Sequence, residues 1–230
     1  MSSKSQPEQK SVAAQTDTDA PGTATSGTGL IHVVDDDDSL RGALLRLLEA
    51  AGFEVRGYAS AGEFLLQRLP DSPSCLLLDI RMPGPSGLAL HESLQRQGTA
   101  LPVVFLTGHG DVATGVWAMK AGAVDFLTKP VERDALLAAL KRALARDALQ
   151  RASRREAEQL RRRFASLTVR EREVFDRIVA GKLNKQVADE LGVSERTVKA
   201  ERAQVLAKLG ASSVADLGQL NEQLRRLSEG

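Results

Sequence analysis

The chain of 230 residues has few of the side chains that form crosslinks or bind soft metals, with one cysteine and three histidines. A single cysteine excludes a disulfide within the chain. Cys75 lies inside an apolar run, so we expect a buried core thiol. The histidines show no metal-ligand spacing, and we interpret all three as structural or solvated: His32, His91 and His109.

Long apolar runs are also missing, since none approaches the roughly 18 residues that a membrane-spanning helix needs. The first 28 residues contain no leucine, isoleucine or aromatic residue. Such a segment cannot bury enough apolar surface to offset the entropy lost on ordering, so we expect residues 1–28 to form a disordered tail. It also lacks the basic-then-apolar pattern of a secretion signal. We therefore expect a cytoplasmic protein with no membrane partner.

The formal net charge of +1 hides an uneven distribution along the chain. Residues 1–149 carry 14 lysines and arginines against 18 aspartates and glutamates, whereas residues 150–230 carry 17 against 12. A basic segment attracts a polyanion such as DNA, although charged faces are commonly only solvated. The asymmetry makes the C-terminal part the candidate for nucleic-acid binding.

Short apolar runs alternate with helix-length segments from residue 30 onwards, and such runs are typical of buried strands in a parallel sheet. We expect strands at 30–34, 53–59, 75–78, 103–106 and 124–127. We expect helices at about 39–51, 61–68, 88–97 and 112–121, and a last one that begins near Glu132. Five strand-then-helix repeats predict an α/β domain with a flavodoxin-like, doubly wound five-stranded parallel sheet.

The remainder of the chain predicts only helices. No glycine or proline interrupts residues 131–180, so the last helix should continue through a basic linker, as a solvated helix rather than a strong coiled coil. Four short helices follow, the first opened by a capping-box pattern at Thr168 and the second capped by Asn184. The expected organisation is a tail (1–28), an α/β domain (29–148), a helical linker (149–165) and an all-α four-helix domain (166–230).

Polar side chains stand where several of the expected strands end. Asp35 and Asp36 follow the first strand and Asp79 the third, while Thr107 and Lys129 follow the fourth and fifth. Ligand sites of open α/β sheets lie beyond the carboxyl ends of the strands. The common strand order 2-1-3-4-5 would therefore bring these five residues to one edge of the sheet.

A group of carboxylates is repulsive unless a divalent cation lies among the oxygens, and Mg²⁺ fits best. The carboxylate of Asp79 can attack phosphorus and form an acyl phosphate, while Thr107 and Lys129 can donate hydrogen bonds to the phosphoryl oxygens. Asp37 and Asp38 are interpreted instead as residues that favour the start of a helix. The strand ends thus predict a phosphoryl-transfer site that uses Mg²⁺.

These strand-end residues, with the segments RMPGPSG at 81–87 and TGHGD at 107–111, resemble the receiver domain of two-component response regulators of the FixJ branch. The resemblance implies that Asp79 is the phosphoacceptor. It also implies that Asp36, Asp79 and the backbone carbonyl of Arg81 hold Mg²⁺, with Asp35 acting mainly through water.

The same resemblance implies a cis peptide bond before Pro130. It implies that Phe126 turns inward with Thr107 on phosphorylation, a role compatible with the core packing that the residue pattern alone favours. Val131 stands where relatives often carry phenylalanine, which leaves the local packing open but not the chemistry.

Two of the C-terminal helices are separated by the short turn at 192–194, which makes them a helix-turn-helix candidate. The second helix of such a motif enters the major groove, while phosphate contacts set its orientation. Helical periodicity turns three apolar residues inward: Val198, Val205 and Leu209. It leaves three others outward: Lys199, Arg202 and Ala203. Lys185 and Arg196 are placed to reach phosphates.

The segments LTVREREV (167–174), AGKLNK (180–185), ADELGVS (188–194) and TVK (197–199) together resemble the LuxR-type DNA-binding domain. The resemblance implies base contacts by Lys199 and its helical neighbours, and dimerisation through the final helix. The expected DNA-binding set is Lys185, Arg196, Thr197, Lys199, Ala200, Arg202 and Ala203. Glu201 departs from the histidine common at its position, and it could either repel phosphates or accept a hydrogen bond from cytosine.

The whole pattern is similar to response regulators of the FixJ/NarL type, which are regulators rather than enzymes. The implied partners are a sensor histidine kinase, promoter DNA, a second copy after phosphorylation, and RNA polymerase. One alternative is a metal-dependent phosphatase with an aspartyl nucleophile, but Arg81 stands where such enzymes usually carry a second acid. The other is a DNA-binding protein whose receiver dimerises without phosphorylation.

Overall fold

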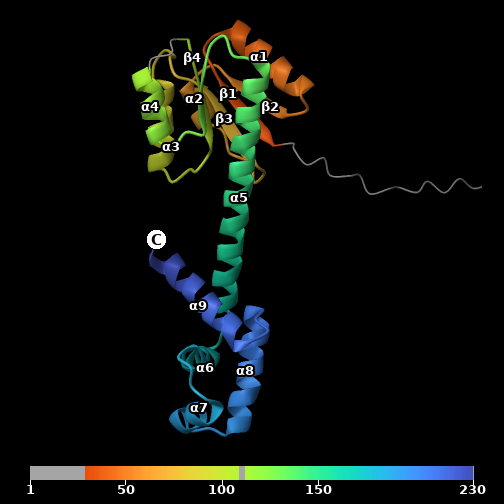
Figure 1. Ribbon diagram of the computed structural model, residues 1–230, viewed down its shortest axis with the longest axis vertical. Coiled ribbons are helices and arrows are strands. Elements are labelled where there is room, and N and C mark those ends of the chain that lie inside the picture. Colours follow the sequence, from red (N-terminus) through yellow and green to blue (C-terminus); the bar gives the residue numbers. More distant parts are fainter. Residues whose placement is uncertain (1–28, 109–111, 230) are drawn as a thin grey trace, which may run out of the picture.

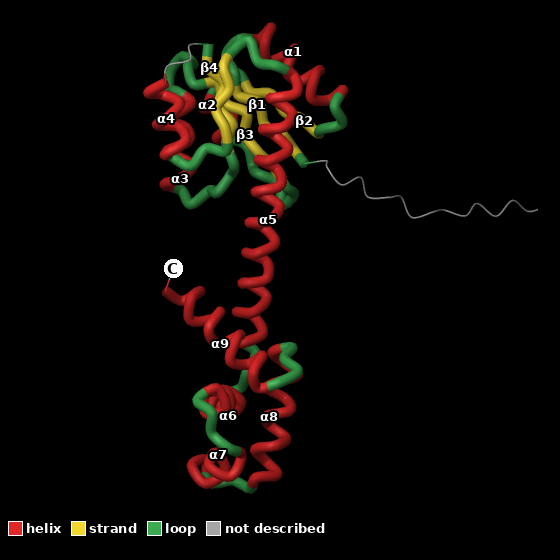
Figure 2. Tube along the Cα trace, in the orientation of Figure 1, coloured by secondary structure: helices red, strands yellow, loops and turns green. Residues whose placement is uncertain are grey.

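The computed structural model describes residues 29–108 and 112–229, so the expected tail and His109 lie outside the described residues. An α/β domain, the long helix α5 (Arg133–Ala165) and a smaller helical domain follow one another along the molecule (Figure 1). Within the described chain, the strands belong to the first domain, while helices and loops make up the rest (Figure 2). None of the described helices is long and apolar enough to cross a membrane.

Five parallel strands form one sheet in the order β2-β1-β3-β4-β5, which confirms the expected topology. The register pairs Val34 with both Tyr58 and Leu78, so the carboxyl ends of neighbouring strands lie level. The strands are β1 (Leu30–Val34), β2 (Glu54–Tyr58), β3 (Ser74–Asp79), β4 (Val103–Thr107) and β5 (Asp125–Thr128).

Alternate residues of the central strands point to opposite faces of the sheet, and both faces are covered. Ile31 and Val33 belong to a core shared with α1 (Asp38–Ala50) and the first half of α5. Val34 belongs to the core on the other face, with α2 (Ala61–Leu65), α3 (Gly87–Arg96) and α4 (Val112–Lys120). Cys75 is fully buried, as expected, and burial raises the pKa of its thiol.

The helix starts follow local capping chemistry. The carboxylate of Asp37 accepts hydrogen bonds from the backbone N–H groups of Ser39 (2.9 Å) and Leu40 (3.1 Å), which confirms that Asp37 opens α1. Asp38 is the first residue of the helix and pairs with Arg41. Only α2 is clearly shorter than expected, since it ends at Leu65 and not at about residue 68.

Helix α5 is one unbroken helix of 33 residues, so the helical course expected for the linker is confirmed. Its first half buries Leu136 and Leu140 against the sheet. Its last turn packs Phe164 against the helical domain, with the ring edge-on to Phe175 at 5.3 Å between centroids. Most of the linker is exposed, while Leu160 is buried and Phe164 is half-buried.

Four helices surround the core of the second domain: α6 (Val169–Val179), α7 (Asn184–Leu191), α8 (Glu195–Leu209) and α9 (Val214–Glu229). Thr168 and Glu171 form the expected reciprocal capping box at α6. The expected cap by Asn184 is wrong, because Asn184 is already the first helical residue. The side chain of Gln186 instead accepts a hydrogen bond from the backbone N–H of Leu183 at 2.9 Å.

Candidate functional site

The carboxylates of Asp35, Asp36 and Asp79 lie together at the carboxyl edge of the sheet, and each offers an oxygen within 4.8 Å of the others. Asp35 and Asp79 are buried, whereas Asp36 is exposed. Strands β1 and β3 are neighbours in the sheet, which is why these three side chains meet. We call them the acidic cluster.

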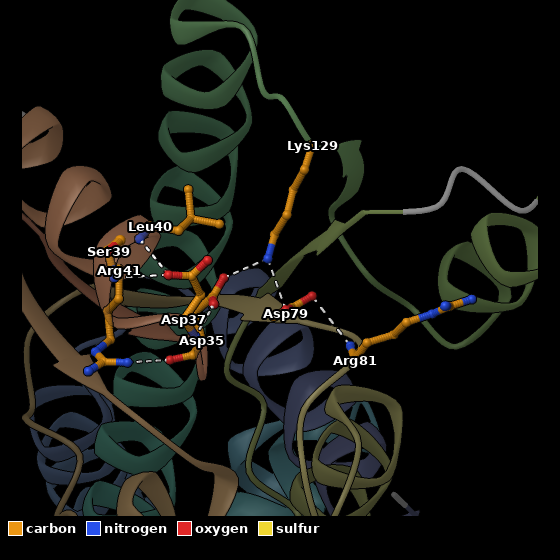
Figure 3. Close-up of polar contacts among 8 residues, drawn as sticks. All are labelled: Asp35, Asp37, Ser39, Leu40, Arg41, Asp79, Arg81 and Lys129. Carbon is orange, nitrogen blue, oxygen red and sulfur yellow. Dashed lines mark hydrogen bonds and ion pairs between the residues drawn. The ribbon is translucent and has the colours of Figure 1, made fainter.

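The ammonium of Lys129 lies between the two buried carboxylates (Figure 3). Its Nζ is 2.8 Å from Oδ2 of Asp35 and 2.9 Å from Oδ2 of Asp79. Burial, the largest single effect, lowers the pKa of Lys129, but the hydrogen bonds and charges of Asp35 and Asp79 together outweigh it and raise the pKa. Lys129 is therefore the cation that neutralises part of the acidic cluster in this structure.

Backbone groups hold the two buried carboxylates in place. The N–H of Arg81 donates to Oδ1 of Asp79 at 3.3 Å, and the side chain of Arg81 points away from the acidic cluster (Figure 3). The N–H of Asp37 donates to Oδ1 of Asp35 at 2.9 Å. Arg41, which the sequence analysis did not single out, donates to the carbonyl of Asp35 at 2.6 Å. The two N–H contacts restrict how far either carboxylate can turn, and the Arg41 contact holds the backbone of Asp35.

Gly87 allows α3 to begin directly beside the end of β3. A Cβ atom at this position would lie 2.1 Å from the carbonyl oxygen of Asp79, a distance that no side chain tolerates. The N–H of Gly87 also donates to the carbonyl of Ile80 at 3.1 Å. The glycine in the RMPGPSG segment is thus a steric requirement of the strand that carries Asp79.

Thr107 and Phe126 come from the neighbouring strands β4 and β5. Thr107 is buried, and its carbonyl accepts a hydrogen bond from the N–H of Lys129 at 2.7 Å. The peptide bond between Lys129 and Pro130 is cis, as the resemblance implied. Phe126 is half-buried and packs with the core beneath α4, where a Cβ added at Gly115 would lie 3.3 Å from its ring.

The donor set of the acidic cluster fits a hard divalent cation. Mg²⁺ prefers carboxylate oxygens and keeps several waters in its octahedron. Two buried carboxylates beside an exposed one provide such oxygens together with a side open to water. Asp79 also belongs to this set, so a cation bound here would contact the carboxylate that is the candidate nucleophile.

The helix-turn-helix candidate consists of α7, a turn at 192–194 and α8. Ser194 caps α8, because its Oγ accepts a hydrogen bond from the N–H of Thr197 at 3.1 Å. The three residues expected to face inward are buried: Val198, Val205 and Leu209. Five of the expected DNA-binding residues are exposed: Lys185, Arg196, Lys199, Ala200 and Ala203.

The other two expected DNA-binding residues are half-buried and have partners inside the domain. The hydroxyl of Thr197 is hydrogen-bonded to that of Ser194 at 2.9 Å. Arg202 donates to Oδ1 of Asn184 at 3.0 Å and so ties α8 to α7. Arg202 is therefore less outward than the periodicity predicted. Periodicity could not reveal this contact, because it assigns a face without identifying the helix opposite.

Two family models match the chain, one on each domain. The model described as "Response regulator receiver domain" matches residues 31–141. The model described as "Bacterial regulatory proteins, luxR family" matches residues 165–220. The first match contains the acidic cluster and Lys129, and the second contains the helix-turn-helix candidate.

Similar proteins match the two domains in one chain. Nodulation protein W of Bradyrhizobium diazoefficiens is 44% identical over 202 residues, which cover 88% of this chain and 89% of that protein. Transcriptional regulatory protein FixJ of Azorhizobium caulinodans is 43% identical over 187 residues, covering 81% and 89% respectively.

A solved structure of the response regulator StyR is similar along most of its length. It is 46% identical and has a TM-score of 0.78, covering 84% of this chain and 98% of that chain. The chain therefore belongs to the transcriptional response regulators in which a receiver domain precedes a LuxR-family DNA-binding domain.

Proposed function

We propose that Asp79 accepts a phosphoryl group from a sensor histidine kinase and that this modification switches on DNA binding. The observation that carries the proposal is the position of Asp79. Its carboxylate lies in the acidic cluster and 2.9 Å from the ammonium of Lys129. The receiver domain implies a kinase and the LuxR-family domain implies DNA as partners, and the cytoplasm is the proposed site of action.

In the proposed reaction, an oxygen of Asp79 attacks the phosphorus of a phosphohistidine on the kinase. The new P–O bond forms as the P–N bond breaks, and the imidazole leaves with that electron pair and takes up a proton. The ammonium of Lys129 and the hydroxyl of Thr107 then donate hydrogen bonds to the phosphoryl oxygens. Lys129 exchanges its contact with the Asp79 carboxylate for one with the new anion.

Asp36, Asp79 and the backbone carbonyl of Arg81 are the proposed ligands of Mg²⁺, and Asp35 is proposed to act mainly through water. Mg²⁺ supplies positive charge that offsets the repulsion between the carboxylates and the incoming phosphoryl group. The open side of the acidic cluster at Asp36 supports this assignment.

Thr107 and Phe126 are the proposed switch residues. The Phe126 ring lies close to Gly115, so an inward turn of the ring would alter the packing of α4. Helix α4 also exposes the apolar side chains of Val116 and Met119, which suit a homodimer of phosphorylated receivers.

A dimer would place two DNA-binding domains on promoter half-sites, within reach of RNA polymerase. The proposed DNA contacts on each domain are Lys185, Arg196, Thr197, Lys199, Ala200, Arg202 and Ala203.

Intact-mass measurement tests the phosphoacceptor. We expect the full chain with acetyl phosphate and Mg²⁺ to gain the mass of one phosphoryl group, and a chelator to suppress the gain. Asp79→Asn should gain none, while Asp134→Asn, which changes an exposed aspartate on α5, should be labelled like the unaltered protein.

Equal labelling of Asp79→Asn would contradict the proposal. Steady turnover of a phosphate ester would indicate a metal-dependent phosphatase instead. DNA affinity and oligomeric state that stay unchanged after full labelling would indicate DNA binding independent of phosphorylation.

A further inference from the structure

Glu201 lies on the recognition helix α8, yet its carboxylate is directed toward α6. Its Oε1 is 3.8 Å from Nε of Arg170, the second residue of α6, and its side chain is only 22% exposed. Its Oε2 is buried and has no hydrogen-bond partner among the described residues. A carboxylate with one oxygen buried and the other paired is not presented on the surface that carries Lys199 and Ala203.

Arg170 occupies the junction of three helices. Its Nη1 is 3.1 Å from Oε2 of Glu173 on its own helix. Its Nη2 donates to the carbonyl of Leu191, the last residue of α7, at 3.2 Å. With Glu201 as its third partner, the guanidinium links α6, the end of α7 and the recognition helix. Because the guanidinium is planar and rigid, these contacts fix an angle as well as a distance.

We propose that Glu201 is a positioning residue, which acts through Arg170 to hold the recognition helix and does not itself contact DNA. The proposal deepens the DNA-binding role proposed above and rests on it. The Arg202–Asn184 bond follows Glu201 in sequence and ties α8 to α7, so two adjacent residues anchor the same stretch of the helix.

The pairing also changes the electrostatics of the DNA-binding surface. A free carboxylate on the recognition helix would repel phosphates and oppose the binding of any duplex. The guanidinium of Arg170, which Glu201 shares with Glu173, offsets part of the negative charge of Glu201 within the domain. The cations Arg196 and Lys199 on the same helix are exposed.

The experiment measures binding of the full chain, labelled with acetyl phosphate, to two duplexes at several salt concentrations. One duplex is the sequence that the unaltered protein enriches from a random pool, and the other is a scrambled version. The variants are Glu201→Gln, Arg170→Gln and the pair together. Glu195→Gln is the matched control, because it removes an exposed carboxylate from the same helix. Thermal melting checks folding, and Arg170→Lys replaces Arg170→Gln if the latter does not fold.

We expect Glu201→Gln to lower the ratio of selected to scrambled affinity about fivefold, with an unchanged salt dependence. The double variant should have an affinity ratio no lower than that of the poorer single variant, because both single changes break the same contact between Glu201 and Arg170. Glu195→Gln should leave the ratio unchanged and shift both affinities together.

Three results would overturn the inference. The first is a rise in affinity for both duplexes with a steeper salt dependence, which indicates that Glu201 faces phosphates. The second is a loss confined to duplexes with cytosine at one position, which indicates direct base reading. The third is additivity of the two single changes. If the unaltered chain enriches no duplex at all, the proposed DNA-binding function fails and not this inference alone.

Discussion

The pKa values of Lys129 and His32 are shifted by the surroundings that the fold gives them. Lys129 follows a strand in the sequence, and in the fold it is the counter-ion of two buried carboxylates. His32 lies in the middle of β1, where its Nδ1 is hydrogen-bonded to the hydroxyl of Tyr58 at 2.9 Å. The expectation of a structural role is confirmed for His32 and for His91, which contacts the carbonyl of Ala121 at 2.9 Å.

Replacing Lys129 with methionine should destabilise the receiver domain in the absence of magnesium. The change leaves Asp35 and Asp79 buried without their cation, so the free energy of unfolding should fall by about 3 kcal/mol. Millimolar Mg²⁺ should recover more stability in this variant than in the unaltered protein. Urea unfolding with and without Mg²⁺ measures both effects. Lys141→Met, at an exposed position of α5, is the control, and equal stability of the two variants would contradict the prediction.

The free energy of unfolding should fall as the pH is lowered, because His32 is buried in its neutral form. Burial, and then the charge of Arg56, lowers the pKa of His32 to about 4. The unfolded chain binds this proton at a pKa of about 6.5, so between these values the unfolded state holds more protons. The free energy of unfolding is therefore unaffected by His32 above about pH 6.5. It falls by up to about 3 kcal/mol as the pH is lowered toward 4. Urea unfolding at pH 7 and pH 4.5 should show a smaller acid loss in His32→Gln, and identical losses would refute this origin.

At the scale of elements, α5 is fixed to the receiver domain by a buried carboxylate. Asp147 is 3% exposed and accepts a hydrogen bond from the N–H of Ser74, the first residue of β3, at 2.8 Å. It also accepts one from Nε of Arg151 at 2.6 Å. Arg151 and Arg155 both pair with Asp71 in the loop before β3. These contacts lie where the helix leaves the domain, so they set its direction.

Asp147→Asn should weaken this attachment. An amide oxygen can replace Oδ2, which accepts both hydrogen bonds, but it carries no charge for Arg151, so we expect a loss of about 2 kcal/mol in the free energy of unfolding of the receiver domain. Asp134→Asn, at an almost fully exposed position of the same helix, should change it by less than about 0.5 kcal/mol. Urea unfolding distinguishes the two, and similar small effects would show that Asp147 does not anchor the helix.

At the scale of the whole molecule, α5 is part of two hydrophobic cores. The ring of Phe164 lies against Phe175 of α6, and the guanidinium of Arg172 stands 4.8 Å from its centroid. Leu160 is also buried. The domain boundary expected at residue 166 remains a prediction, but these contacts place the end of the linker within the packing of the second domain.

A fragment of residues 157–230 should therefore be more stable than one of residues 166–230. The shorter fragment lacks the half-buried Phe164 and the buried Leu160, and the loss of the two together should cost about 3 kcal/mol. Urea unfolding of the two fragments measures the difference. In the longer fragment, Phe164→Ala should reproduce most of the loss, and Gln159→Ala, at an exposed position, should not. Equal stability of the fragments would mean that the second domain folds without the linker.

Much of the architecture could be predicted because its signals are local. Apolar runs marked the five strands to within a residue or two, and Asp37 and Thr168 marked helix starts through short-range hydrogen bonds. The cap assigned to Asn184 failed because Asn184 is already the first helical residue and its Oδ1 accepts a hydrogen bond from Arg202 on another helix. The individual roles of Arg41 and Arg170 escaped notice because they depend on residues of other elements.

The sequence by itself determined which residues could do chemistry, because strand ends and helix periodicity are properties of short segments. Only the tertiary structure decided how those residues are used. Lys129 reaches Asp35 across 94 positions of sequence and Asp79 across 50, so its placement between them depends on the order of the strands. The two readings of Glu201 that the sequence left open both had it facing DNA, whereas the packing of α8 on α6 turns its carboxylate inward. The physical reason is the same in both cases, since a charge is positioned by its nearest partners and those partners are distant in sequence.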